Sequence, residues 1–439
     1  MKAKLSLLPI FTFLAIFIGV GSYLHAQGVD YAFYQFPAPV AIIPALILAV
    51  ILGGKDLTST LDTLVRGAGN KDIISMCLIY LLAGAFAVVS KASGGVDSTV
   101  NFGLSIIPLQ FIIPGLFVIA AFVSTAMGTS MGTIAAISPI AYALGEKTGI
   151  DMSLLAGVVL GGSMFGDNLS IISDTTIAAT RSQGCAMKDK FRENIYIALP
   201  AAIITILFLF TIPVENLSLK IEDYHFIKIA PYLAILILAL LGINVFVVLM
   251  TGVLFAGIVA MSGVKDYSYL KFSQDIFEGF KSMQEIFLLS MFIGALSAIV
   301  KSQGGMKVLL YPIEKAIIKA SAKKGPLSNL VKEFGVSIMV SIVDICTANN
   351  TVAIIVTGPL AREIVDNHGL SPRRSASLMD VFSCVFQGLI PYGAQALLVA
   401  SSFKLSPFEV TATAYYCWVL AFVAVINIIY VSYRKSASF

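Results

Sequence analysis

Long runs of apolar residues constrain this chain more than any other feature, because each approaches the roughly 20 residues that cross a bilayer as a helix. Such runs follow one another along all 439 residues. Only 12% of the residues are charged and 58% are hydrophobic, whereas a soluble domain carries about 25% charged residues. We therefore predict an all-α polytopic membrane protein; a transmembrane barrel would show short alternating strands instead.

The first 30 residues begin with Lys2 and Lys4 and continue into a long apolar run. A signal peptide has the same plan, but this run is long for one and residues 24–26 make a poor cleavage site. We interpret residues 1–30 as an extra N-terminal helix that forms the first span.

The rest of the chain carries a weak internal duplication. Lys55-Asp56 pairs with Lys265-Asp266, STAMGTSMGTIAAISPIA (124–141) with DICTANNTVAIIVTGPLA (344–361), and FGDNLSIISDTTIAAT (165–180) with FQGLIPYGAQALLVAS (386–401). Shared apolar composition is the alternative explanation. The constant order and the nearly constant offset favour a single transmembrane domain with repeat 1 at 31–213 and repeat 2 at 243–434.

The Lys and Arg residues predict that the second repeat is inverted, because positive residues favour the cytoplasmic side. Both termini then lie in the cytoplasm, and spans 37–54 and 243–263 run in opposite directions. The weak point is 265–281, which places three lysines outside. In full, we predict about ten transmembrane helices at 5–24, 37–54, 72–91, 152–180, 193–213, 226–242, 243–263, 284–300, 375–401 and 411–433, with two re-entrant hairpins at 109–144 and 334–367.

Four polar or glycine-rich stretches interrupt these apolar segments and pair through the duplication. They are GTSMGT (128–133), GDNLSIISDTT (166–176), TANNT (347–351) and QGLIPYGAQ (387–395). Irregular backbone at membrane depth is tolerated where it lines a cavity or is buried in protein. Inverted repeats with broken helices are typical of secondary transporters, whose substrates bind at such breaks.

Three carboxylates fall within or beside these breaks: Asp167, Asp174 and Asp344. An intramembrane carboxylate costs at least about 2.5–3.5 kcal/mol, so each is a candidate functional group. Carboxylate, amide and hydroxyl oxygens suit a hard cation such as Na⁺, and a desolvated carboxylate also holds a proton more readily. Competition between Na⁺ and H⁺ for Asp167 and Asp174 would give exchange. The alternative is that either aspartate caps a half-helix.

Further polar residues at the breaks are candidate ligands with structural alternatives. The hydroxyls of GTSMGT could serve helix packing alone, whereas the adjacent amides of TANNT need polar partners. Asp380 could face either a cavity or the cytoplasmic end. The residues that we expect at the second-repeat and hairpin site are Thr129, Ser130, Thr133, Asp344, Asn349, Asn350, Thr351, Gln387 and Gln395.

The runs GTSMGT and GDNLSIISDTT resemble the NhaC-type Na⁺/H⁺ antiporter family, which carries GTS-x-GT followed by GD-x-x-S-x-x-SDTT. The resemblance implies a fold of the ion-transporter superfamily, often a homodimer, and a cation site at these motifs. Two positions depart from the family pattern, Met131 and Ile171, and relatives of this shorter type look closer to amino-acid and organic-acid carriers. By this resemblance the cation and proton ligands are Asp167, Asp174, Asn168, Ser170, Ser173, Thr175 and Thr176.

These features favour a secondary active transporter of the cell membrane that exchanges Na⁺ for H⁺. The alternative is Na⁺- or H⁺-coupled transport of an amino acid or small organic acid, because a pure cation exchanger has less need for so many amides. A channel or intramembrane hydrolase is a third reading, but the chain has no Walker, HExxH or GxSxG motif. We expect no catalytic residue, no nucleic-acid partner and no cofactor beyond the transported or coupling ions.

Overall fold

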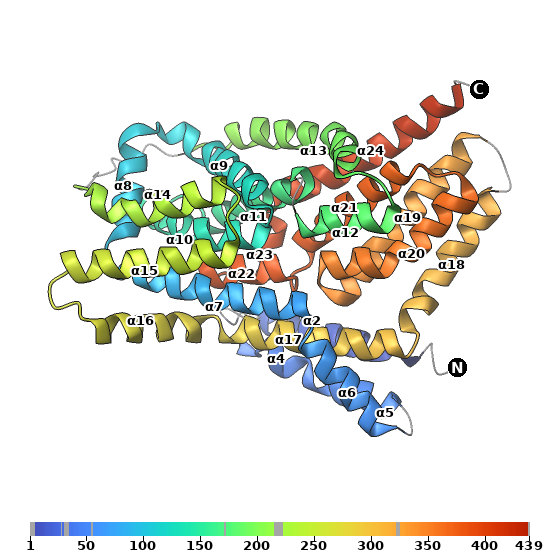
Figure 1. The fold of residues 1–439 in the computed structure, drawn as a ribbon, viewed down its shortest axis with the longest axis horizontal. Coiled ribbons are helices and arrows are strands. Elements are labelled where there is room, and N and C mark those ends of the chain that lie inside the picture. The colour runs from blue at the N-terminus through green and yellow to red at the C-terminus, as the bar shows by residue number, and fades with distance from the viewer. Residues whose placement is uncertain are drawn as a thin grey trace.

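The computed structural model describes residues 5–27, 29, 35–53, 56–170, 173–214, 223–321 and 325–437, and its regular structure is helical throughout these ranges. Motif residue Ile171 lies outside the described residues, as do Lys2, Lys4 and Lys55. Most helices lie along the long axis of the molecule (Figure 1). The start of α2 (Leu8–Ala26) and the end of α24 (Tyr415–Ala437) lie towards the same end of that axis.

The helices after α2 fall into a first and a second half of the chain. The first half contains α4 (Ala38–Ala41), α5 (Ile43–Leu52), α6 (Leu57–Ala68), α7 (Lys71–Ala92), α8 (Gly95–Ile106), the short 3-10 helix η1 (Leu109–Phe111), α9 (Ile112–Met127), α10 (Ser130–Thr148), α11 (Met152–Leu169), α12 (Asp174–Gln183) and α13 (Met187–Phe210). The second half contains α14 (Phe226–Leu240), α15 (Val245–Gly263), α16 (Tyr269–Ser282), α17 (Gln284–Ser302), α18 (Gly305–Ser321), α19 (Pro326–Thr347), α20 (Asn350–His368), α21 (Pro372–Leu389), α22 (Ala394–Phe403) and α23 (Pro407–Ala412), followed by α24. The division into repeats at 31–213 and 243–434 and the inversion of the second repeat stay predictions.

Seven helical segments of the described chain are long and apolar enough to cross a membrane. They are α7, α13, α15, α17, α24 and the two broken pairs α11–α12 and α21–α22. Shorter apolar helices occupy the other predicted spans, at α2, α4–α5 and α14. The segment 265–281, expected as a loop, instead forms the helix α16, whose start is capped by the Ser268 hydroxyl.

All four predicted breaks are present. α9 ends before Gly128 and α19 before Ala348, and both of these residues have positive φ, 69° and 49°. An extended residue follows each of them, Thr129 in the first hairpin and Asn349 in the second. The other two breaks separate α11 from α12 and α21 from α22. Each break therefore ends one helix and starts another inside the bundle, which leaves main-chain groups available for other partners.

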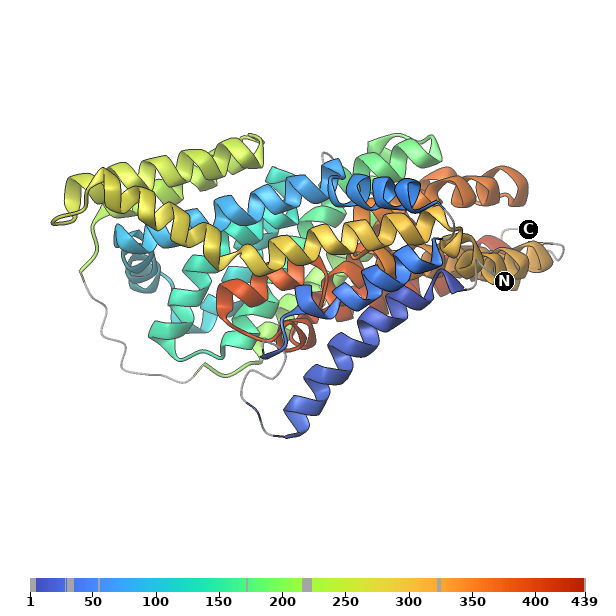
Figure 2. The ribbon, with the colours of Figure 1, turned by 90° about the horizontal axis from the view of Figure 1, so that it is seen from below.

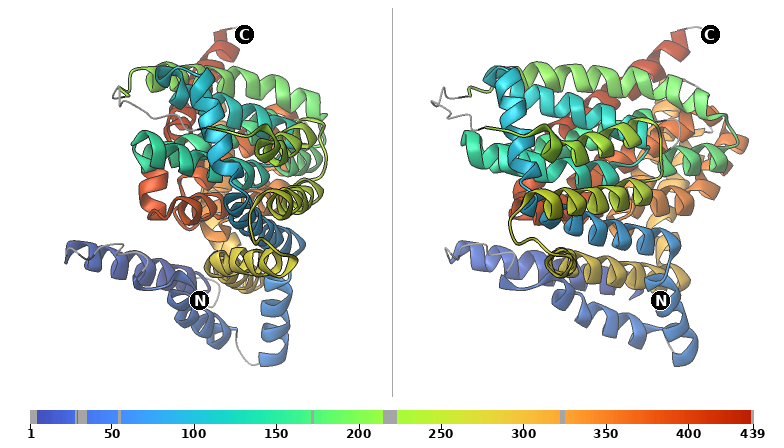
Figure 3. Two further views of the ribbon diagram at one scale, coloured as in Figure 1. Left: turned by 90° about the vertical axis from the view of Figure 1, so that its left-hand side faces the viewer. Right: turned by 60° about the vertical axis from the view of Figure 1, so that its left-hand side comes forward.

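The two halves pack on one another in a reciprocal way. α6 packs against α17 and α16 against α7, while α12 contacts α20 and α22 contacts α10. Glycines allow the closest approaches, because a Cβ on Gly67 would lie 2.7 Å from the Gly294 carbonyl oxygen. Small residues at helix crossings are typical of membrane proteins. Figures 2 and 3 show α2 and α5 at the edge of this bundle, where both contact α17.

Candidate functional site

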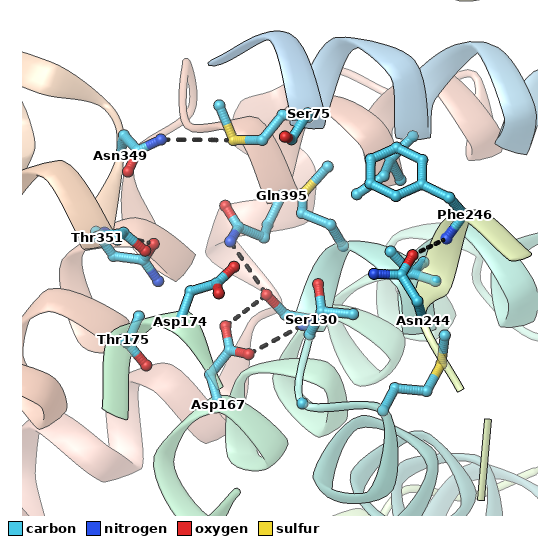
Figure 4. A pocket seen from close by; sticks show the side chains of 18 of the residues that line it. Ser75, Ser130, Asp167, Asp174, Thr175, Asn244, Phe246, Asn349, Thr351 and Gln395 are labelled. Carbon is cyan, nitrogen blue, oxygen red and sulfur yellow. Dashed lines mark hydrogen bonds between the residues drawn. The ribbon is translucent and has the colours of Figure 1, made fainter. Parts of the chain in front are cut away.

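A cavity of about 460 Å³ lies where the broken helices meet α7 and α15. Five helices have their first residue in its wall, namely α7, α10, α12, α15 and α20. Helix N-termini carry partial positive charge and free N–H groups, so the wall offers donors for anionic groups. Figure 4 shows the side chains around it. Those predicted from the sequence are Thr129, Ser130, Asp167, Asp174, Thr175, Asn349, Asn350, Thr351 and Gln395.

Asp167, in the last turn of α11, is held by the opposing hairpin. Its side chain is 4% exposed. The Ser130 main-chain N–H donates to Oδ1 over 2.9 Å and the Ser130 hydroxyl donates to Oδ2 over 2.5 Å. Ser130 is the first residue of α10, so Asp167 stabilises the N-terminus of a half-helix that is not its own. The capping role is therefore present, together with a place in the cavity wall.

Asp174 has different surroundings, although it lies close enough to Asp167 for the two charges to interact. It is the first residue of α12, and its side chain is exposed. The cap of α12 is not Asp174 but Ser173, whose hydroxyl oxygen accepts from the Thr176 N–H over 3.2 Å. Asp174 is therefore not the N-cap of its own helix. Figure 4 shows its carboxylate directed into the space near Asp167 and Ser130.

A chain of hydrogen bonds connects Asp167 to the second half of the protein. The Gln395 amide donates to the Ser130 hydroxyl oxygen over 3.1 Å. Gln387 in turn donates to the Gln395 amide oxygen over 2.7 Å and to the Ala348 carbonyl over 3.2 Å. Gln387 is outside the cavity wall, so its part is to hold Gln395 and the second hairpin in place.

Several predicted ligands stabilise the α11–α12 break and do not line the cavity. The Thr176 hydroxyl donates to the Ser170 carbonyl over 2.8 Å, and the Ser173 hydroxyl donates to the Asp167 carbonyl over 3.2 Å. The Asn168 amide donates to the Met164 carbonyl over 2.9 Å. The Thr176 and Ser173 bonds therefore connect the start of α12 to the end of α11.

Two more predicted ligands also lie outside the cavity wall. The Thr133 hydroxyl donates to the Thr129 carbonyl over 3.1 Å, within α10. Asp344 is fully buried in the last turn of α19, and neither carboxylate oxygen has a hydrogen-bond partner among the described residues. Asp344 therefore lies outside the wall of the cavity that Asp167 lines.

The sequence did not identify two groups of cavity residues. Lys71, Ser75 and Met76 come from the first turns of α7, and Asn244 precedes α15. The Asn244 side chain caps α15 by accepting from the Phe246 N–H over 2.9 Å. The available signal was an asparagine at the start of the predicted span 243–263, which contains Asn244.

A second cavity, of about 750 Å³, adjoins the first and shares Asp174 and Thr351 with it. Its wall consists of residues of α12 and α20 and contains two guanidinium groups, Arg181 and Arg362. Arg362 forms an ion pair with Asp366 at 3.0 Å. Asp174 therefore stands between the two cavities.

Comparisons with known proteins show which family the chain is similar to. The model of the Na⁺/H⁺ antiporter family matches residues 2–212 and 215–431. The malate-2H⁺/Na⁺-lactate antiporter of Bacillus subtilis is 24% identical, with 94% of this chain and 93% of that protein covered. The Na⁺/H⁺ antiporter NhaC of Alkalihalophilus pseudofirmus is 21% identical, with 88% and 89% covered.

Among solved structures, the YdaH transporter of Alcanivorax borkumensis aligns with a TM-score of 0.46 at 13% identity, covering 97% of this chain and 98% of that one. The match to the family model extends over nearly the whole sequence. The chain belongs to the Na⁺/H⁺ antiporter family, and it is a multi-pass membrane protein and a secondary active transporter.

Proposed function

We propose that this transporter exchanges Na⁺ for H⁺ at Asp167 and Asp174, each of which binds either the cation or the proton during the cycle. The observation that supports this most strongly is the pair of carboxylates in one cavity wall, one nearly buried and one exposed. Carboxylate, hydroxyl and amide oxygens of the same wall are suitable ligands for Na⁺. A cation and a proton cannot both occupy the same carboxylate oxygen, so binding of one favours release of the other.

We further propose that the end of the molecule carrying the start of α2 and the end of α24 faces the cytoplasm. Arg181 and Arg362 line the second cavity, and positive residues favour the cytoplasmic side. Asp174 would then be reached from the cytoplasm through the second cavity.

A homodimer, which the family resemblance implies, is part of the same proposal.

An organic acid or amino acid as additional cargo is the second candidate. The convergence of five helix N-termini on the cavity favours a carboxylate group there. Lys71, Asn244 and Asn349 add a positive charge and two amides to the wall. The relative named as a malate-2H⁺/Na⁺-lactate antiporter has a cargo of this kind in its name.

Proteoliposomes with an internal pH dye test the proposal. We expect a Na⁺ gradient alone to move protons, and we expect Asp167→Asn and Asp174→Asn to abolish this signal. Asp62→Asn, at an exposed carboxylate of α6 outside both cavities, is the matched control and keeps it. A signal that appears only after lactate or malate is added would reject simple exchange and favour the second candidate. Full activity in both cavity variants would contradict the assignment of the two aspartates.

A further inference from the structure

A buried group of charged and polar side chains lies behind the α11–α12 break, outside both cavities. Its centre is the Lys190 ammonium. Lys190 lies between the predicted spans 152–180 and 193–213, but in the structure it is fully buried in the first turn of α13. Asp380 of α21, for which the sequence left two surroundings open, is equally buried and is the ion-pair partner.

Three oxygens surround the Lys190 ammonium at short distances. Nζ lies 2.8 Å from Oδ2 of Asp380. It also donates to the Asn168 carbonyl over 3.0 Å and to the Thr176 hydroxyl oxygen over 2.7 Å. The Asn168 carbonyl belongs to the last turn of α11, where main-chain carbonyls lack helical partners and carry partial negative charge. A carboxylate, a helix-terminal carbonyl and a hydroxyl together form a ligand set for a monovalent cation.

The same cluster has more buried acceptors than the ammonium satisfies. The side-chain oxygens Oδ1 of Asn168, Asn194 and Asp380 have no hydrogen-bond partner among the described residues, although the Thr175 hydroxyl lies near the Asp380 carboxylate. All three residues are 0% exposed. The Asn194 amide donates to the Asp380 Oδ2 over 2.7 Å and to the Asn168 carbonyl over 2.8 Å. Buried acceptors are normally satisfied, so the remaining Asp380 Oδ1 makes the cluster favourable to positive charge.

We propose that the Asn168 carbonyl, the Thr176 hydroxyl and the Asp380 carboxylate form a second cation site, separate from the cavity, and that the Lys190 ammonium is the cation that fills it. The protein thereby carries a tethered positive charge in a position with the oxygen ligands that Na⁺ requires. Two consequences follow. Lys190 connects the end of α11 to the first turn of α12 through Asn168 and Thr176. It also keeps Na⁺ out of this second position.

Removing the ammonium while leaving space for a free cation tests the proposal. The background is the Asp167→Asn/Asp174→Asn variant, in which the two cavity carboxylates are neutral, and the readout is thermal unfolding in detergent against NaCl or methylammonium chloride. We expect Lys190→Ala to be stabilised by both cations with a saturable dependence, because a ligand that binds the folded state raises the unfolding temperature. Choline chloride, whose cation is too large for the site, controls for ionic strength.

Three further variants define the expected pattern. Lys190→Met fills the space without charge and is expected to show no cation response. Lys190→Ala/Asp380→Asn removes the carboxylate as well and is also expected to show none. Lys188→Ala, at an exposed lysine of the same helix, should behave like its background.

The proposal is overturned if Lys190→Ala shows no saturable response, or if Lys190→Met or the double variant responds equally. Recovery of Lys190→Ala only when Na⁺ or methylammonium is present during purification would support it. Failure to recover that variant with either cation, while Lys190→Ala/Asp380→Asn is recovered, would contradict it. These outcomes do not depend on transport, so they are independent of whether Asp167 and Asp174 exchange Na⁺ for H⁺.

Discussion

At the scale of single residues, Asp167 and Asp174 are separated by only one break in the chain but are stabilised differently. Asp167 accepts two hydrogen bonds from Ser130 and contributes to the start of α10. Asp174 lies at the start of its own half-helix and faces both cavities. Asp167 stabilises the start of an opposing helix, so its ion binding is suited to depend on the position of that helix. Asp174 lies between two cavities and is suited to receiving an ion from outside.

Ser130→Ala tests the coupling between Asp167 and the hairpin. The variant removes the hydroxyl bond to the ionised carboxylate, which is worth about 1.5–3 kcal/mol, and leaves the main-chain bond. We expect the Na⁺ concentration for half-maximal exchange at neutral pH to rise by roughly tenfold, since about 1.4 kcal/mol corresponds to a factor of ten. The difference should shrink at alkaline pH, where protons compete less for the carboxylate.

The control for this measurement is Thr133→Val, because the Thr133 hydroxyl bonds within α10 and does not line the cavity. Proton flux in proteoliposomes over a series of Na⁺ concentrations gives the half-maximal value. An unchanged value in Ser130→Ala would show that the hydroxyl does not stabilise the ion-binding form of Asp167.

At the scale of helices, close glycine contacts between the two halves position the elements that carry the site. α7 lines the cavity with its first turns and packs against α16 through Gly84 and Gly279. A Cβ at position 279 would lie 2.4 Å from the Ala85 nitrogen, so the two backbones touch. The position of the first turns of α7 in the cavity wall therefore depends on the contact between Gly84 and Gly279, which lies further along the helix.

Gly279→Ala is expected to lower stability, because overpacking a close helix contact costs about 1–3 kcal/mol. The measurement is the thermal unfolding temperature in detergent. Gly103→Ala in α8 is the control: nothing lies within 4 Å of the added Cβ there, and replacing a glycine inside a helix by alanine stabilises by roughly 0.5–1 kcal/mol. Equal unfolding temperatures for the two variants would mean that α7 and α16 can separate without cost.

At the scale of the whole molecule, the sequence predicted what depends on position along the chain. Apolar runs gave the helices, and Gly128, Asn349 and similar polar or small residues marked the breaks because they interrupt those runs. Apolar runs do not show which neighbouring helices a side chain faces, so this could not be predicted from the sequence. Asp344 lies in the predicted hairpin but outside the cavity wall, and Lys190 lies between two predicted spans although tertiary packing buries it.

The inverted arrangement of the two halves is a prediction of the same scale, and it fixes which ends of the helices share a side of the membrane. The start of α16 lies at one end of the long axis, whereas the start of α19 lies towards the end that carries the start of α2 and the end of α24 (Figure 1). Tyr269 is the first residue of α16 and Leu327 the second residue of α19. Both side chains are exposed, 81% for Tyr269 and 70% for Leu327.

In a background with Cys185 and Cys346 replaced by serine, we expect Tyr269→Cys to react with a membrane-impermeant maleimide in intact cells. Leu327→Cys should react only after permeabilisation, because positive residues place its end of the protein in the cytoplasm. Labelling of both cysteines in intact cells would contradict the inverted topology, since the turn before α16 and the start of α19 would then share one side.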